Sequence, residues 1–272
     1  MPELPEVEVT KNGIAGYLID QKITKVYFDD KSLRKPFLPN LYNLEGAEVR
    51  KVERRAKYII IMTTKGYLLL HLGMTGHLTV LDKGVQRAVH DHFEIELSNK
   101  KIIRLNDIRR FGLVLYYPLE QSPYESEYLK DLGPEPFSDE FNAEYLYSKL
   151  SRHSKSIKQT ITDNYVVVGI GNIYASEVLF KTKINPTTPA NKISLRQCQN
   201  LVSNIRDILS ESINKGGTTI RDFSGADGRL GYFVQNLNVY GHKNDPCPVC
   251  GHKIVSIIQG QRSTFYCPNC QK

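Results

Sequence analysis

Two Cys-x-x-Cys pairs near the end of the chain restrict its fold more than any other feature. They read C247-P-V-C250 and C267-P-N-C270, with sixteen residues between them. Each pair can sit on a tight turn, so four thiolates can converge on one tetrahedral ion, and this spacing is typical of a zinc ribbon. The alternative is two disulfides, which a reducing compartment disfavours. We therefore expect one structural Zn²⁺ on Cys247, Cys250, Cys267 and Cys270, with no ligand position left for catalysis.

The segment before Pro118 has the pattern of short strands behind one helix. Residues 5–17 place apolar side chains near one face, which predicts a helix. Runs rich in Ile, Val and Tyr follow, separated by turn residues, and they predict a β-sandwich or barrel with this helix packed on it. The expected strands are 22–28, 47–53, 58–63, 67–72, 92–97, 102–105 and 112–117.

The chain changes character after Pro118. Residues 119–139 are rich in Pro, Ser and Glu, which predicts a linker with one short helix near residues 125–132. Beyond the linker the apolar spacing becomes helical, and a glycine-rich stretch at 218–232 predicts a long functional loop. The expected helices are 141–150, 172–181 and 194–213.

The fifth cysteine, Cys198, stands apart from the other four. It follows a capping box, S194-L-R-Q197, and lies on the apolar face of the helix that this box opens. We expect a packed thiol there and not a reactive one.

The charge of the chain favours an anionic partner. Lys and Arg number 36 against 29 Asp and Glu, which gives a net charge of +7 and a pI near 9.0. No apolar run approaches the roughly 20 residues of a membrane helix, and no signal peptide pattern is present. From these patterns we expect a cytoplasmic protein.

The opening residues, M-P-E-L-P-E-V, combine two prolines with two carboxylates. Proline and acidic residues suit the first turn of a helix, whose N-terminus is electropositive. The second interpretation is chemical, because removal of Met1 would leave Pro2 with a free secondary amine beside Glu3 and Glu6. These residues alone leave both interpretations open.

Several turns carry cations or bulky apolar groups. The segments R54-R-A-K57, L72-G-M-T-G76 and N106-D-I-R-R-F-G112 supply what a protein needs to enter DNA, namely a cation for phosphates and a wedge for the base stack. Met74 and Phe111 could equally be core residues. The glycine-rich stretch V168-G-I-G-N-I-Y174 precedes a helix, where backbone amides can hold a phosphate.

Taken together, these segments resemble the formamidopyrimidine-DNA glycosylase family, whose bacterial members remove oxidised purines from DNA. The resemblance implies an α+β multidomain fold: an N-terminal β-sandwich with flanking helices, a helix–two-turns–helix domain and a C-terminal zinc ribbon. The implied boundaries are 1–118, a linker at 119–139, a DNA-binding domain at 140–238 with a lesion-recognition loop at 218–232, and the zinc finger at 239–272. The resembling segments, in family order, are P2-E-L-P-E-V, R55-A-K-Y, H71-L-G-M-T-G, D107-I-R-R-F-G, G169-I-G-N-I-Y-A-S-E177, G216-G-T-T-I-R-D-F and V239-Y-G.

The resemblance also implies roles for single residues. Pro2 would attack C1′ of the damaged nucleotide and form a Schiff base, with Glu3 as proton donor and Glu6 supporting the amine. Lys57 would donate a proton or hold a phosphate. The implied DNA contacts are His71, Asn172 and Arg262 at phosphates, Tyr240 beside them, and Met74, Arg109 and Phe111 in the gap left by the extruded base.

The activity implied is that of a bifunctional glycosylase and abasic-site lyase. Its substrates would be 8-oxoguanine opposite cytosine and formamidopyrimidines in double-stranded DNA, with cleavage of abasic sites by β/δ elimination, in a nucleoid-associated monomer that binds no membrane. One departure is Ile108, which stands where the family commonly has proline and is expected to loosen that turn. The alternatives are an endonuclease VIII-like enzyme for oxidised pyrimidines, a non-catalytic damage binder, and a plain zinc-ribbon module that would leave the first 240 residues unexplained.

Overall fold

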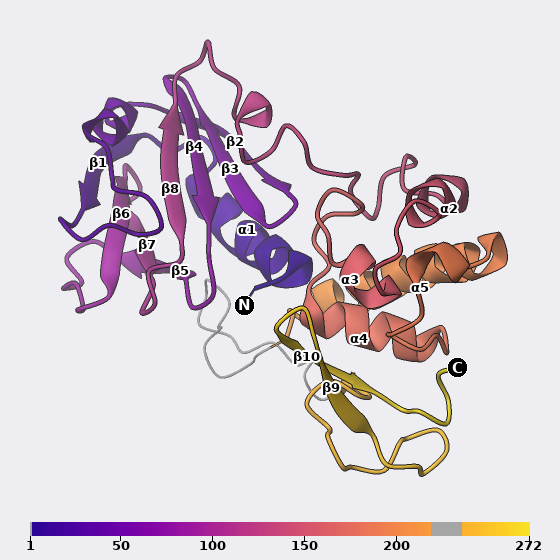
Figure 1. The fold of residues 1–272 in the computed structure, drawn as a ribbon. Coiled ribbons are helices and arrows are strands. Elements are labelled where there is room, and N and C mark those ends of the chain that lie inside the picture. The colour runs from indigo at the N-terminus through magenta and orange to yellow at the C-terminus, as the bar shows by residue number, and fades with distance from the viewer. Residues whose placement is uncertain (1, 219–235) are drawn as a thin grey trace. The chain divides into compact units, whose positions relative to one another are not determined.

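The computed structural model describes residues 2–218 and 236–272 (Figure 1). The chain forms two compact units. The first unit comprises Met1–Asp131 with Lys215–Tyr232, and the second comprises Leu132–Asn214 with Phe233–Lys272.

The first unit is a β-sandwich with a helix at its N-terminal end, as the sequence predicts (Figure 1). One antiparallel sheet has the order β1-β6-β7-β5 and the other has the order β2-β3-β4-β8. Their apolar faces share one core with the helix α1. The elements are α1 Leu4–Leu18, β1 Ile23–Phe28, η1 Pro39–Leu44, β2 Val49–Arg55, β3 Tyr58–Thr63, β4 Gly66–His71, β5 His77–Asp82, β6 Asp91–Leu97, β7 Lys101–Asn106, β8 Leu113–Tyr117 and η2 Pro123–Glu125.

The sequence analysis missed β5. This strand lies at the edge of its sheet, and only Leu78 on it is buried. The other edge strands β1, β2 and β8, which were predicted, each bury two side chains, whereas β5 buries one and so carries a weaker alternation of apolar and polar residues. The short helix expected near 125–132 is also wrong, because in this described part of the chain the only helical segment is η2, which ends at Glu125.

Helix α1 is fixed by its first turn and by its apolar face. Pro5 occupies the first turn, and the Glu6 carboxylate accepts a hydrogen bond from the backbone of Glu3. Val7, Ile14 and Leu18 are buried in the sandwich core. The helix therefore places the first residues of the chain against a rigid sheet instead of leaving them to fray.

Two connections cross from one sheet to the other at the same end of the sandwich. Residues 72–76 link β4 to β5, and residues 107–112 link β7 to β8. Because His71 pairs with Leu113 in one sheet and His77 pairs with Asn106 in the other, both ends of the two connections are neighbours. The topology thus places residues 72–76, the Met74 turn, next to residues 107–112, the Arg109 turn.

The second unit combines helices with a hairpin (Figure 1). The long helix α5 packs on α2 and α4, and the hairpin β9–β10 packs on α4. The expected helix at 172–181 is confirmed at both ends, whereas the five-residue α3 was not expected. The elements are α2 Ala143–Leu150, α3 Ile157–Ile161, α4 Asn172–Lys181, η3 Ala190–Lys192, α5 Leu195–Asn214, β9 Val255–Gln259 and β10 Arg262–Tyr266.

The predicted capping box opens α5. The Ser194 hydroxyl accepts from the amide of Gln197, and the Gln197 side chain accepts from the amide of Ser194. Cys198 is fully buried on the apolar face, and burial raises the pKa of its thiol to about 11. The expectation of a packed thiol is confirmed.

Among the helices of the described residues, none has the length and apolar character needed to cross a membrane.

Candidate functional site

The N-terminal segment is buried and held by one carboxylate. Pro2, Glu3 and Glu6 are all buried. Glu6 Oε2 accepts from the backbone amide of Glu3 at 2.8 Å, and Glu6 Oε1 accepts from the amide and the hydroxyl of Thr218 at 2.9 and 2.8 Å. A β-carbon at Gly217 would lie 3.3 Å from Glu6 Oε1, and glycine also suits the positive φ of 80° there. Glu6 therefore joins the start of α1 to a segment more than 200 residues away.

Lys57 lies in the turn before β3, and His71 lies at the end of the neighbouring strand β4. Ala56 and Lys57 form the two-residue turn between β2 and β3, with Ala56 at a φ of 53°. The next residue, Tyr58, pairs with His71 on β4, and the centres of their rings are 4.7 Å apart. Lys57 is 8% exposed, so its stem is packed. The hairpin geometry brings these two predicted site residues to one end of the sheet.

The protonation state of His71 is set by its surroundings. Burial lowers the pKa of His71 to about 3, with the nearby charges of Arg34 and Lys57 adding to the effect. The amide of Gly73 donates to His71 Nδ1 at 3.0 Å, so the proton of the neutral ring resides on Nε2. His71 can therefore offer a phosphate a neutral N–H donor, without a positive charge.

The three predicted gap-filling residues lie on the two adjacent connections. Met74 is 36% exposed and Phe111 is 45% exposed, so neither is a core residue. The guanidinium carbon of Arg109 lies 4.9 Å from the centre of the Phe111 ring, which is within cation–π range. Ile108, which precedes Arg109, is also exposed.

Arg34 is a residue of this region that the sequence analysis missed. Its amide donates to the carbonyl of Gly112 at 3.1 Å, which ties its loop to the Arg109 turn. Its guanidinium carbon lies 5.8 Å from the centre of the Tyr128 ring, and its charge acts on His71. The only sequence signal was an Arg-Lys pair in a loop, which is too common to indicate a site.

Asn172 and Arg262 share a polar cavity of about 310 Å³ in the second unit. Asn172 is the first residue of α4, and Arg262 is the first residue of β10. Asn172 Nδ2 donates to the carbonyl of Ser263 at 2.8 Å, and Asn172 Oδ1 accepts from the buried Lys158 ammonium. Lys158, whose role the sequence did not indicate, also donates to Thr264 Oγ1 at 2.7 Å. Three cations, Lys155, Lys158 and Arg262, line the cavity against one carboxylate, Asp163, and this excess of positive charge suits an anion such as a phosphate.

Tyr240 packs against the strand β10 in the second unit. Its ring meets the Phe265 ring edge-on, with centres 5.1 Å apart. Its amide, together with those of Asn238 and Val239, donates to the buried carboxylate of Glu177 at 2.9 to 3.0 Å. Glu177 thus positions the segment that carries Tyr240, a role that the sequence analysis did not assign.

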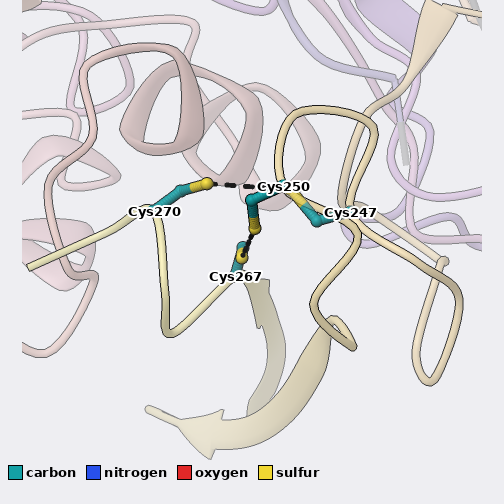
Figure 2. A group of neighbouring side chains, drawn as sticks. All are labelled: Cys247, Cys250, Cys267 and Cys270. Atoms are coloured by element: carbon teal, nitrogen blue, oxygen red, sulfur yellow. Dashed lines mark hydrogen bonds between the residues drawn. The ribbon is translucent and has the colours of Figure 1, made fainter.

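The four cysteines of the two pairs converge as predicted (Figure 2). Their sulfur atoms lie within 4.8 Å of one another, with Cys247 and Cys270 at 3.8 Å and Cys250 and Cys267 at 3.5 Å. A tetrahedral zinc with Zn–S bonds of about 2.3 Å requires sulfur separations of about 3.8 Å, so the set fits one structural Zn²⁺. Cys247 and Cys267 are buried with Phe180, which anchors the metal site to α4.

The predicted lesion-recognition loop at 218–232 lies outside the described residues except for Thr218. Thr218 itself is buried and bonded to Glu6.

Comparisons with known protein families cover most of the chain. The profile of the formamidopyrimidine-DNA glycosylase N-terminal domain matches residues 1–114. That of the formamidopyrimidine-DNA glycosylase H2TH domain matches residues 132–224. A zinc finger found in FPG and IleRS matches residues 244–272.

Individual relatives match the sequence of this chain along its full length. The chain is 48% identical over 273 residues to the formamidopyrimidine-DNA glycosylase of Pasteurella multocida strain Pm70, covering 100% of both chains. It is 47% identical over 272 residues to that of Legionella pneumophila strain Lens, covering 100% of this chain and 98% of the relative.

Solved structures show the same fold. A Lactococcus lactis FPG mutant in complex with Fapy-dG-containing DNA superposes with a TM-score of 0.92 at 31% identity, over 100% of both chains. The MutM (FPG) protein of Thermus thermophilus superposes with a TM-score of 0.89 at 30% identity, over 99% and 98% of the two chains. The predicted α+β fold with sandwich, helix–two-turns–helix domain and zinc ribbon is confirmed, and the chain belongs to the formamidopyrimidine-DNA glycosylase family of base-excision repair enzymes.

Proposed function

We propose that this protein excises oxidised purines from double-stranded DNA and cleaves the strand at the resulting abasic site. The observation that carries the proposal is the buried Pro2–Glu3 segment, held at the start of α1 by Glu6. Catalysis by a chain terminus requires that the terminus be ordered, and termini usually fray. Relatives support the substrate class, because structures are known of a Lactococcus lactis FPG mutant in complex with Fapy-dG-containing DNA and of the Lactococcus lactis Fpg in complex with DNA that contains an abasic site.

The chemistry begins with the amine of Pro2 in the chain that lacks Met1. Its lone pair attacks C1′, the glycosidic bond breaks, and the departing base takes the bonding electrons and a proton. The proton that the amine loses on forming the bond to C1′ passes to Glu3, which gives it to the sugar oxygen as the ring opens and leaves an iminium between Pro2 and C1′. An α-amino group has a pKa of roughly 7.7–8.0, so a reactive neutral fraction exists near pH 7.

Strand cleavage follows from the same intermediate. The iminium withdraws electrons from C2′, so loss of a C2′ proton expels the 3′ phosphate, and a second elimination expels the 5′ phosphate. Lys57, packed at the β2–β3 turn, donates a proton or holds a phosphate during these steps. Water then releases the sugar fragment from Pro2.

The remaining predicted residues hold the DNA. His71, Asn172 and Arg262 bind phosphates around the lesion, and Tyr240 contacts the DNA near these phosphates. Met74, Arg109 and Phe111 occupy the space of the extruded base, which offsets part of the few kcal/mol that extrusion costs. One structural zinc holds the hairpin that presents Arg262.

The domain boundaries predicted from the sequence are part of this proposal. Residues 1–118 are the catalytic domain, 119–139 a linker, 140–238 the DNA-binding domain with its lesion-recognition loop at 218–232, and 239–272 the zinc finger. We further propose that the enzyme acts as a nucleoid-associated monomer in the cytoplasm.

The decisive experiment is borohydride trapping on a duplex with 8-oxoguanine opposite cytosine. A covalent DNA adduct mapped to Pro2 by mass spectrometry is the expected result. A correctly processed protein that gives an adduct only on oxidised pyrimidines would overturn the substrate assignment. An adduct on any residue other than Pro2 would overturn the mechanism.

A further inference from the structure

The two connections that carry the gap-filling residues are in close backbone contact. Gly73 has a φ of 65°, and a β-carbon there would lie 2.4 Å from the carbonyl carbon of Phe111 and 2.6 Å from the amide nitrogen of Gly112. No side chain could be accommodated without moving one connection away from the other. The Met74 turn and the Arg109 turn therefore pack as a single body.

One buried hydroxyl links these two turns. Thr75, which follows Met74, is 8% exposed, and its Oγ1 donates to Asp107 Oδ1 at 2.6 Å. The same Oγ1 accepts from the amide of Arg109 at 3.0 Å. A single atom of one turn thus bonds both a side chain and the backbone of the other.

The carboxylate and the carbonyl of Asp107 also accept hydrogen bonds within the Arg109 turn. It is 0% exposed, and its second oxygen, Oδ2, accepts from the amide of Gly112 at 2.7 Å. Its carbonyl accepts from the amide of Arg110 at 3.2 Å and lies 3.2 Å from Nε2 of His92, whose Nδ1 lies 2.7 Å from a carboxylate oxygen of Asp29. The carboxylate bridges the first and last residues of its own turn, so the exposed residues between them are held in one conformation.

We propose that Thr75 and Asp107 are positioning residues for base extrusion, because they join Met74, Arg109 and Phe111 into one rigid wedge. The inference rests on the proposed function of DNA base excision. A wedge on two independent loops would lose conformational entropy each time it entered the base stack, and a preformed wedge avoids that cost.

The test compares Thr75→Val with Thr75→Ser. Valine keeps the shape of the side chain but removes the hydroxyl, which leaves Asp107 Oδ1 and the Arg109 amide without this bond, whereas serine keeps the hydroxyl. Thr79→Val on β5 is the matched control, because it makes the same chemical change on the strand that follows the Met74 turn. Thermal unfolding of each variant shows whether the fold persists.

Each protein is assayed for base excision on two substrates. In the first, 8-oxoguanine is paired with cytosine in a duplex. In the second, it lies in an unpaired bubble, where extrusion requires little work. We expect Thr75→Val to lose roughly 10- to 100-fold in kcat/KM on the paired lesion, as for loss of a hydrogen bond to a charged group. The loss on the bubble should be about threefold or less, and Thr75→Ser should restore most of the activity on the duplex.

The outcomes separate the two proposals. If kcat/KM of Thr75→Val falls equally on both substrates, or falls no further than that of Thr79→Val, the wedge inference is wrong while the proposed function stands. If Thr75→Val does not fold, the ratio of the two rates in Asp107→Asn decides, because a wedge defect lowers the rate on the paired lesion selectively. A wild-type protein that excises the base from neither substrate would overturn the proposed function itself.

Discussion

Replacing Glu6 with glutamine should damage both the stability and the chemistry of the N-terminal segment. The carboxylate is 2% exposed and accepts hydrogen bonds from the Glu3 amide and from two donors of Thr218. Glutamine offers one oxygen and one NH₂ group. If its oxygen accepts the hydrogen bonds from Thr218, its NH₂ group faces the amide of Glu3, so two buried donors face each other without an acceptor.

The cost follows from these contacts. A bond to a charged acceptor contributes about 1.5–3 kcal/mol, and a buried donor left unsatisfied costs about 1–3 kcal/mol. We therefore expect Glu6→Gln to lower the free energy of unfolding by about 2–4 kcal/mol, which corresponds to a fall in Tm of roughly 5–15 °C. Pro2 and Glu3 would also lose their fixed position, and a misplacement of about 1 Å can cost on the order of 100-fold in rate.

The assays are thermal unfolding and the rate of borohydride trapping on an 8-oxoguanine duplex. Glu8→Gln is the matched control, because Glu8 lies on the same helix and its partners are the cations Arg54 and Lys11. Partly exposed ion pairs of this kind contribute about 0–1 kcal/mol. If Glu6→Gln matches Glu8→Gln in both Tm and trapping rate, the positioning role of Glu6 is refuted.

Three further predictions follow from single sites. Cys247→Ser should release the zinc and unfold the hairpin that it anchors, so metal analysis should show less than one zinc per chain, and an unchanged zinc content would contradict the site. His71 should stay neutral from pH 8 to pH 5, with its ring NMR shifts constant, because its pKa lies near 3. Since the unfolded chain protonates this ring near pH 6.5, stability attributable to His71 should be constant above that pH and decline as pH falls from 6.5 toward 3, and His71→Gln should remove this part of the decline. Cys198 should resist alkylation in the native protein, because burial raises the pKa of its thiol to about 11, and rapid labelling at pH 8 without unfolding would show that it is not packed as described.

The sequence indicated best the features that depend on local spacing. The two cysteine pairs predicted the metal site, since each pair needs only its own turn to present two sulfurs. Both ends of helix α4 were predicted correctly, and the ends of α5, which begins with the capping box, were predicted to within one residue. Helical periodicity and caps depend only on residues that are close in the sequence. The strand β5 was missed because it buries only one side chain, Leu78, and therefore carries little periodic signal.

The resemblance of short segments to a known family placed Pro2, Lys57 and Arg109 in a functional context, which their residue types alone did not. What the sequence by itself determined, therefore, was the metal ligands, the main helices, most strands and the family. Only the tertiary structure decided what Glu6 and Asp107 bond to, because Glu6 meets Thr218 across 212 positions and Asp107 meets Thr75 across 32. Hydrogen bonds of this range are made by the packing of strands and helices, and no pattern of neighbouring residues specifies them.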